Sequence, residues 1–258
     1  MKFFISIDLE GCAGVVGMMH GTLDDSKNYT FACEQAVMEA NAAARALFDC
    51  GAEEVVICDG HGDGTNLDYR KLDPRCKILM GTPMRERFCI LQNDFDGMLL
   101  MGYHGMEGSP SVLAHSFNSR ANQYIKVNGK MVGEIDIDAI VAGSRGVPVI
   151  FVSSDDVTVS EARQILPYIR YVETKQSLGH NYILSKNPQS VLDEIYTEVK
   201  KAANEASKMA PYLVEGPYQV EIRFTRAEDA EHAVKHLGFS LLDSHTVARQ
   251  MDDLGTYF

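Results

Sequence analysis

Short runs of almost wholly apolar residues alternate with longer helical stretches over the first two thirds of the chain. These runs are residues 3–7, 55–58, 77–80, 98–101 and 147–152. Runs without apolar–polar alternation are typical of strands that are covered on both faces. Residues 29–50 are predicted to form a helix that Ser26 or Asn28 caps, with Gly51 just past its end. The alternation of strand and helix predicts an α/β fold with a parallel, doubly wound sheet.

Two segments break this alternation. Residues 124–132 have the pattern of a hairpin around the Asn128-Gly129 turn, the strongest short hairpin signal. After a linker between Pro211 and Pro217, the chain has the pattern of a half-buried strand, a helix and a further strand, at 218–225, 227–237 and 240–251. We therefore expect an α/β domain over residues 1–210, with a hairpin insertion near 122–132, and a small α+β domain over residues 211–258.

Composition and charge narrow the class of protein. The chain has 258 residues, of which 45% are hydrophobic and 23% charged, as in an ordinary soluble globular protein. Its net charge of −12 argues against nucleic acid and anionic membrane surfaces as partners. The six cysteines form no C-x-x-C pair, and no apolar stretch is long enough to span a membrane. We expect a cytoplasmic protein with free thiols and no signal peptide.

Acids and histidines follow the predicted strands at the points where the strands end. Asp8 and Glu10 come after the first strand, His61 after the second and His104 after the fourth. Glu134 begins a predicted helix that follows the hairpin. Ligands of parallel sheets bind outside the carboxyl ends of the strands, so this fold is able to bring the five side chains together. Asp8 and Glu10 are two residues apart in extended chain and therefore point the same way.

This set of donors has the chemistry of a metal site. Three carboxylates in one dry pocket repel each other, and divalent cations remove the repulsion. Imidazole and carboxylate ligands without thiolate favour zinc over manganese or iron. Five ligands exceed what one tetrahedral zinc with an open position takes, so we expect two zinc ions about 3.5–4 Å apart with Asp8 as the bridge. The alternative is that Asp8 and Glu10 cap turns and that the histidines are hydrogen-bonded loop residues.

The remaining candidates carry weaker signals. His115 lies in a loop rich in Gly, Ser and Pro, where it is either a general acid or base or a loop histidine without a role. Asp59, two residues before His61, is either an orienting partner of that imidazole or a turn residue. His232 and His236 are four apart on a predicted helix, and their charged neighbours favour a solvated face over a metal site.

Several motifs, in order along the chain, make the sequence similar to a known family. They are Ser6-Ile7-Asp8-Leu9-Glu10-Gly11, Asp59-Gly60-His61, Gly102-Tyr103-His104, Leu113-Ala114-His115-Ser116, Gly133-Glu134-Ile135 and Lys175-Gln176. Together they resemble the D-aminopeptidase family of the dipeptide-transport operon, the DppA-like binuclear zinc peptidases. The resemblance covers the chain from residue 1 to about residue 176.

The resemblance implies a fold, a site and an activity. The implied fold is a Rossmann-like α/β domain with a largely parallel sheet and a smaller α+β domain, assembled into a homo-oligomeric ring, a homodecamer. The implied ligands of two zinc ions per subunit are Asp8, which bridges the ions, with Glu10, His61, His104 and Glu134. His115 matches the catalytic residue. The implied substrates are short peptides or amides with an N-terminal D-residue.

The sequence also departs from the family. Asp136 and Asp138 add acids just after Glu134, and His180 stands in a segment that differs, which leaves the substrate preference open. We expect a metal-activated water as the nucleophile, with His115 donating a proton to the leaving amine or steadying the tetrahedral intermediate. Two alternatives stay open: a dinuclear metal amidase that acts on a non-peptide amide, and a non-catalytic peptide-binding ring.

Overall fold

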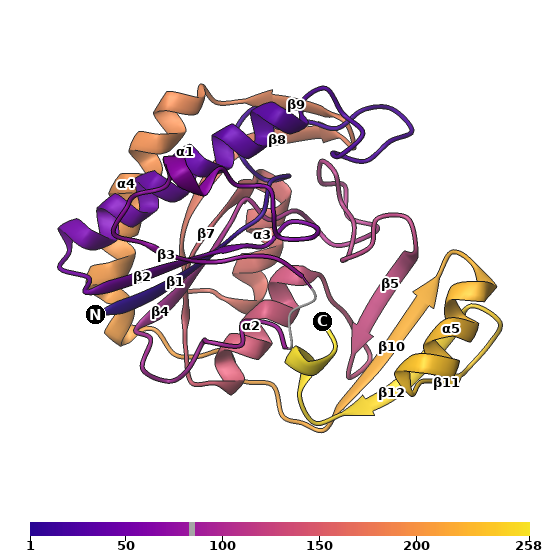
Figure 1. The fold of residues 1–258 in the computed structure, drawn as a ribbon. Coiled ribbons are helices and arrows are strands. Elements are labelled where there is room, and N and C mark those ends of the chain that lie inside the picture. The colour runs from indigo at the N-terminus through magenta and orange to yellow at the C-terminus, as the bar shows by residue number, and fades with distance from the viewer. Residues whose placement is uncertain (83–85) are drawn as a thin grey trace.

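The larger sheet of the computed structural model, which describes residues 1–82 and 86–258, has seven strands (Figure 1). Its strand order is β3-β2-β1-β4-β7-β8-β9, and every neighbouring pair is parallel except β8 and β9. The strands are β1 Lys2–Ile7, β2 Glu54–Asp59, β3 Lys77–Leu79, β4 Gly97–Met101, β7 Val149–Asp155, β8 Arg170–Gly179 and β9 Tyr182–Ser185. Strands β4 and β7 bury every residue, as their position inside the sheet requires.

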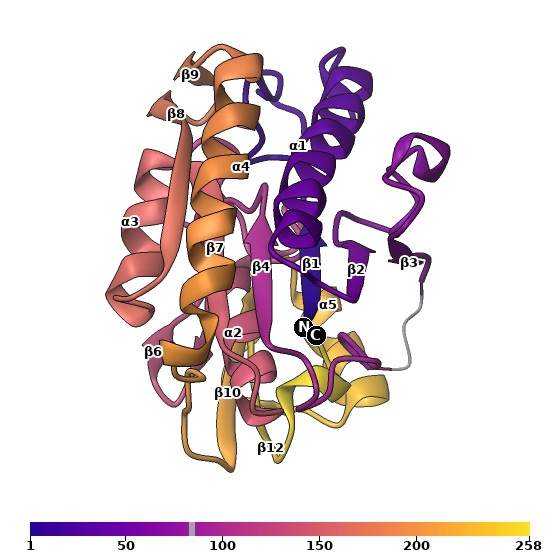
Figure 2. The same cartoon turned by 90° about the vertical axis from the view of Figure 1, so that its left-hand side faces the viewer.

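Helices cover both faces of this sheet (Figures 1 and 2). On one face α1 Tyr29–Asp49 packs against α4 Pro188–Glu205, and on the other lie α2 Glu134–Ser144 and α3 Asp156–Ile165. Each face has its own apolar core. The predicted fold class is confirmed, because a largely parallel sheet lies between two layers of helices.

The second sheet is antiparallel throughout. Its strands, in spatial order, are β11 Ser240–Leu241, β12 Thr246–Met251, β10 Tyr218–Phe224, β5 Asn122–Val127 and β6 Lys130–Met131, and α5 Ala227–Leu237 packs on it. The predicted hairpin is therefore paired with the C-terminal strands, and Ile125 of β5 lies opposite Ile222 of β10. Alternate residues of β10 are buried, which explains the alternating pattern of its sequence. The division into residues 1–210 and 211–258 stays a prediction.

Some local features differ from the sequence-based expectation. Asn28 occupies the N-cap position of α1, one of the two predicted, but its side chain makes no bond to the helix, and its Oδ1 accepts the backbone N–H of Val16 at 2.9 Å instead. The apolar pattern predicts no element over residues 156–205, where the structure has α3, β8, β9 and α4. The described residues also form short 3₁₀ turns at Tyr69–Lys71, Ala206–Lys208 and Leu254–Thr256. Among the described residues, no helix combines the length and the apolar character that crossing a membrane demands.

The backbones that follow β1 and β4 approach each other closely. Gly102 has φ +67°, and a Cβ there would lie 2.1 Å from the carbonyl oxygen of Asp8. A Cβ at Gly11 would lie 2.0 Å from the carbonyl oxygen of Tyr103. Only glycine fits at these two positions. The close approach brings together the two points from which Asp8 and His104 project.

Candidate active site

The loop after β1 presents two buried carboxylates, those of Asp8 and Glu10, from a firmly held backbone. Lys175 on β8 is also buried, and its ammonium group donates to the carbonyl oxygens of Glu10, Cys12 and Val15, at 2.8 Å for the last two. All three protons of the ammonium group are thereby used on one loop. Lys175 therefore holds the curve of loop 8–15 and the direction in which Glu10 points.

His61 reaches the same two carboxylates from the loop after β2. Its Nδ1 lies 2.9 Å from Oδ1 of Asp8 and 3.1 Å from Oε2 of Glu10. Its Nε2 lies 3.0 Å from Oδ1 of Asp24, a residue in the long loop between β1 and α1. Asp24 accepts the Nε2 proton and so orients the ring with Nδ1 toward the two acids.

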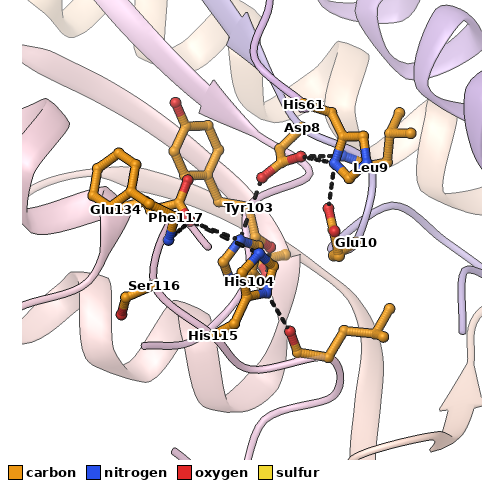
Figure 3. A network of polar contacts seen from close by, with 12 residues as sticks. Asp8, Leu9, Glu10, His61, Tyr103, His104, His115, Ser116, Phe117 and Glu134 are labelled. Carbon is orange, nitrogen blue, oxygen red and sulfur yellow. Dashed lines mark hydrogen bonds and ion pairs between the residues drawn. The ribbon is translucent and has the colours of Figure 1, made fainter. Parts of the chain in front are cut away.

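His104 and Glu134 form a second group on the other side of Asp8 (Figure 3). Nε2 of His104 lies 3.2 Å from Oε1 of Glu134 and 3.5 Å from Oδ2 of Asp8. The Nδ1–H of His104 donates to the carbonyl oxygen of Gly105 at 3.1 Å, which leaves Nε2 free to act as a ligand. Glu134 is the first residue of α2, and its Oε1 also accepts the backbone N–H of Phe117 at 2.7 Å.

Asp8 lies between the two histidines and faces both of them (Figure 3). Its Oδ1 is directed at His61 and its Oδ2 at His104. Ligand atoms of Asp8, Glu10 and His104 all lie within 4.8 Å of one another. The structure thus brings the five predicted ligands together, and Asp8 has the position that a carboxylate bridging two ions needs.

The cluster is short of positive charge. Burial opposes the ionisation of Asp8, but the hydrogen bond and the charge of His61 hold the pKa of Asp8 well below its ordinary value. Burial also opposes protonation of His104, yet the charge of Glu134 raises the pKa of His104 to about 10. The pKa of Glu134 falls to about 2 beside His104, against the effect of burial. These shifts show that the carboxylates favour positive charge on the neighbouring imidazoles. Bound metal cations would supply the same positive charge.

His115 stacks on His104 at the edge of this cluster. The two ring centroids are 3.7 Å apart and the planes differ by 12°. The Nδ1–H of His115 donates to the carbonyl oxygen of Leu113 at 2.8 Å, so its Nε2 is the free nitrogen, 4.0 Å from Oε1 of Glu134. Ligand atoms of His104, His115 and Glu134 lie within 4.8 Å of one another, so His115 is able either to bind an ion or to move a proton. His115 lies at the site and is not a remote loop histidine.

Asp59 has the second of its two expected roles, that of a turn residue. Its carboxylate accepts the backbone N–H groups of Asn66 and Leu67, at 2.6 and 2.9 Å. Asn66 in turn donates its side-chain amide to the carbonyl oxygen of His61 at 2.6 Å. Asp59 therefore supports the backbone of His61, while the carboxylate that accepts the Nε2–H of the ring is that of Asp24.

A cavity of about 520 Å³ opens onto the cluster. Among the predicted site residues, its lining includes Asp8, Glu10, His61, His115 and Glu134. His180, which departs from the family pattern, also lines it, together with Asp24 and Arg87. The sequence predicts no role at the site for Asp24, Arg87 or Lys175, although Lys175-Gln176 is one of the family motifs, because each acts through a partner that is distant along the chain.

A comparison of the whole chain with protein families agrees with this geometry. A model of the Peptidase M55 family, described as D-aminopeptidase, matches residues 1–258. The chain belongs to this family. The predicted family and the predicted class of enzyme, an aminopeptidase that hydrolyses peptide bonds, are confirmed by this match.

Two relatives of this M55 family member extend over nearly the same length. A D-aminopeptidase of Bacillus subtilis (strain 168) is 28% identical over 238 residues, which are 90% of this chain and 85% of that protein. The second is the solved structure of the Zn-dependent D-aminopeptidase DppA from Bacillus subtilis, described as a self-compartmentalizing protease. It superposes with a TM-score of 0.92 at 27% identity, and the match covers 100% of this chain and 94% of that one. The similarity therefore includes the second sheet as well as the first.

Loop 8–15 should depend on the buried ammonium group of Lys175. We expect Lys175→Met to lower the free energy of unfolding by about 2–5 kcal/mol, because three buried carbonyl oxygens lose their donor. Urea unfolding followed by circular dichroism measures this change. The control is Lys186→Met, at an exposed lysine just after β9 that pairs with Glu194, where we expect less than about 0.5 kcal/mol. Equal effects of the two substitutions would contradict the prediction.

Proposed function

We propose that this protein is a zinc-dependent D-aminopeptidase that removes an N-terminal D-residue from short peptides or amides, with two zinc ions per subunit. The observation that carries the proposal is the position of Asp8, which has an imidazole on either side of its carboxylate. Family membership and the description of the similar DppA structure as Zn-dependent support the choice of reaction and of metal.

The side chains around Asp8 fit a pair of zinc ions. The donors are imidazole nitrogens and carboxylate oxygens, which zinc accepts in catalytic sites. Glu10 and His61 would hold one ion, and His104 and Glu134 the other, with one oxygen of Asp8 for each. Ions bound there would lower the pKa of a water molecule towards about 7 and polarise the carbonyl group of the scissile bond.

His115 has the geometry of a proton carrier for the leaving amine. The hydrogen bond from its Nδ1 to Leu113 fixes which nitrogen faces the cavity, and stacking on His104 restricts rotation of the ring. A proton held at Nε2 therefore reaches only groups inside the cavity. Donation of this proton to the leaving nitrogen assists cleavage of the C–N bond.

The wall of the cavity contains acidic residues in addition to the proposed metal ligands. Glu107 and Asp24 both line it. Negative charge around the opening favours a substrate that carries a positive charge, and the free N-terminus of a peptide is an ammonium group. This preference accounts for cleavage at the N-terminus, because an internal peptide bond brings no ammonium group to the same place.

A substrate panel tests the reaction. The zinc-loaded protein should hydrolyse D-alanyl dipeptides with a kcat/KM at least about tenfold above that for the L-alanyl counterparts. When the ammonium group and the carbonyl group of the substrate are both held in place, the two configurations at the α-carbon direct the side chain to different parts of the cavity, and only one of them avoids a steric clash. Release of free amine measures the rates. Faster hydrolysis of simple non-peptide amides would replace the proposal by the amidase alternative. Absence of hydrolysis across the panel would favour the peptide-binding ring.

Two substitutions separate the roles of His115 and Asp8. His115→Ala should lower kcat by about 10²–10⁴-fold, because the proton carrier is lost, and should keep both zinc ions. Asp8→Ala should lose at least one zinc ion per subunit, because the shared ligand is gone. Elemental analysis of the purified variants gives the zinc content. Zinc loss from His115→Ala would make His115 a ligand, and full occupancy in Asp8→Ala would contradict the bridge.

We also propose that the chain assembles into a homo-oligomeric ring, a homodecamer, in the cytoplasm. The similar DppA structure is described as self-compartmentalizing. In this chain the loop after β1 lies beside the β8–β9 hairpin, joined to it by the bond from Gly14 N to Ser185 Oγ (Figure 1). Tyr182 and Leu184 are two residues apart on one face of β9 and both exposed, and apolar patches exposed on a surface are typical of subunit contacts. All six cysteines are free, as a reducing compartment requires.

Sedimentation velocity tests the assembly. The protein should sediment with a mass about ten times the 28.6 kDa of one chain. The double substitution Tyr182→Asp/Leu184→Asp puts charges into the apolar patch and should give smaller species, because it buries unpaired charge at the contact. Leu213→Asp, at an exposed leucine outside this patch, is the control and should leave the mass as it is. A monomeric wild-type protein would contradict the proposal.

A further inference from the structure

One cation stands in the wall of an otherwise acidic cavity. Arg87 is the single Lys or Arg among the described residues that line it, and its side chain is only 9% exposed. Phe117 and Glu134 lie in the same part of the lining. Burying a charged guanidinium costs free energy unless the charge is paired, so the position of Arg87 beside the cluster has to be explained by its partners.

Asp138 holds Arg87 along one edge of the guanidinium. Nε and Nη2 of Arg87 both donate to the Asp138 carboxylate, the second at 2.9 Å. Asp138 is fully buried and also accepts the hydroxyl of Tyr103 at 2.5 Å. The guanidinium carbon lies 5.0 Å from the ring centroids of both Phe88 and Phe117. The plane of the guanidinium is therefore fixed by a carboxylate on one edge and by aromatic rings.

Among the described residues, the other edge of the guanidinium has no hydrogen-bond partner. A guanidinium has five N–H donors, and contact through Nε and Nη2 leaves both hydrogens of Nη1 and the second hydrogen of Nη2. Nη1 makes no hydrogen bond to any described residue, and it is not among the fully buried polar atoms without a partner. Arg87 lines the cavity and its side chain keeps some exposure, so these donors face a ligand bound there. This second edge has the shape that binds a carboxylate through two parallel hydrogen bonds.

The helix that carries Asp138 also carries a proposed metal ligand. Glu134 and Asp138 are four residues apart on α2, so they lie on the same face of the helix. One rigid element thus fixes both the second metal group and the partner of Arg87. The free edge of Arg87 consequently has a set place relative to the reaction centre.

We propose that Arg87 binds the C-terminal carboxylate of the substrate, so that the enzyme prefers short peptides with a free C-terminus. This inference rests on the proposed peptidase function. It assigns the two charged ends of a short peptide to different parts of one cavity, the ammonium group to the acidic wall and the carboxylate to Arg87. Asp24 and Glu107, which are not proposed metal ligands, repel a carboxylate elsewhere on the wall, and Arg87 is the one Lys or Arg of the described lining that attracts it.

The first test needs no substitution. The zinc-loaded wild-type enzyme is assayed with D-Ala-D-Ala and with the same dipeptide as its C-terminal amide. We expect kcat/KM for the free acid to exceed that for the amide by about tenfold or more, because the amide cannot accept two charge-assisted hydrogen bonds. Equal values, or a preference for the amide, would overturn the role of Arg87 and leave the peptidase function intact. Failure to cleave either substrate would instead contradict the proposed function.

The second test changes the guanidinium and its partner together. Arg87→Gln/Asp138→Asn removes both charges and keeps a hydrogen-bonding group at each position, and thermal unfolding checks that the variant is folded. We expect the acid-to-amide ratio of kcat/KM to fall to about one, chiefly through a higher KM for the acid. Arg226→Gln, at an exposed arginine before α5, is the control and should keep the wild-type ratio. An equal loss for acid and amide would overturn the proposal, because it would mean that Arg87 acts on the reacting carbonyl or only on the fold.

Discussion

The structure of the site depends on how the charge of three buried carboxylates is balanced. Asp8, Glu10 and Glu134 lie in one cluster with little access to water. Two imidazoles stand between them. The pKa values of Asp8 and Glu134 are lowered and the pKa of His104 is raised, so these two acids stay ionised and the histidine binds a proton. Such an arrangement is stable only if positive charge is present in the cluster, either as protons or as metal ions. The three buried carboxylates therefore account both for the pKa shifts in the cluster and for its suitability for metal ions.

Contacts of the backbone hold these charged side chains close to one another. Gly11 and Gly102 allow the chains after β1 and β4 to touch, which no residue with a Cβ would permit. Lys175 then ties the carbonyl oxygens of loop 8–15 to β8, and Asp24 turns the ring of His61. Each of these contacts joins segments that are far apart in sequence. The folding energy of the sheet thus offsets the repulsion that would otherwise spread the acids apart.

The parts of this structure that could be predicted from the sequence are those with local signals. Buried parallel strands are continuous apolar runs, so their positions, and the acids and histidines that follow them, are visible in the pattern. The pairing of the β5–β6 hairpin with β10 could not be predicted in this way. Val127 pairs with Val220, about 90 residues further along the chain, and no local pattern near Asn128 specifies so distant a partner. The buried positions of Lys175 and Arg87 are not predicted for the same reason, since a basic residue in a sequence is most often a solvated one.

Asp136 and Asp138, the two acids that depart from the family pattern, show how the structure assigns roles that the sequence does not predict. Asp136 accepts the backbone N–H of Gly133 at the start of α2 and completes a helix cap, a local role. Asp138 is one turn beyond Glu134 and is fully buried, so its charge has to be matched by a cation brought from elsewhere in the chain. Arg87 supplies that charge, and a guanidinium held by one edge always retains donors on the other. The extra acid on α2 therefore has an effect that a neutral residue would not have: it fixes a cation in the wall of the cavity, where an anionic part of a substrate meets it.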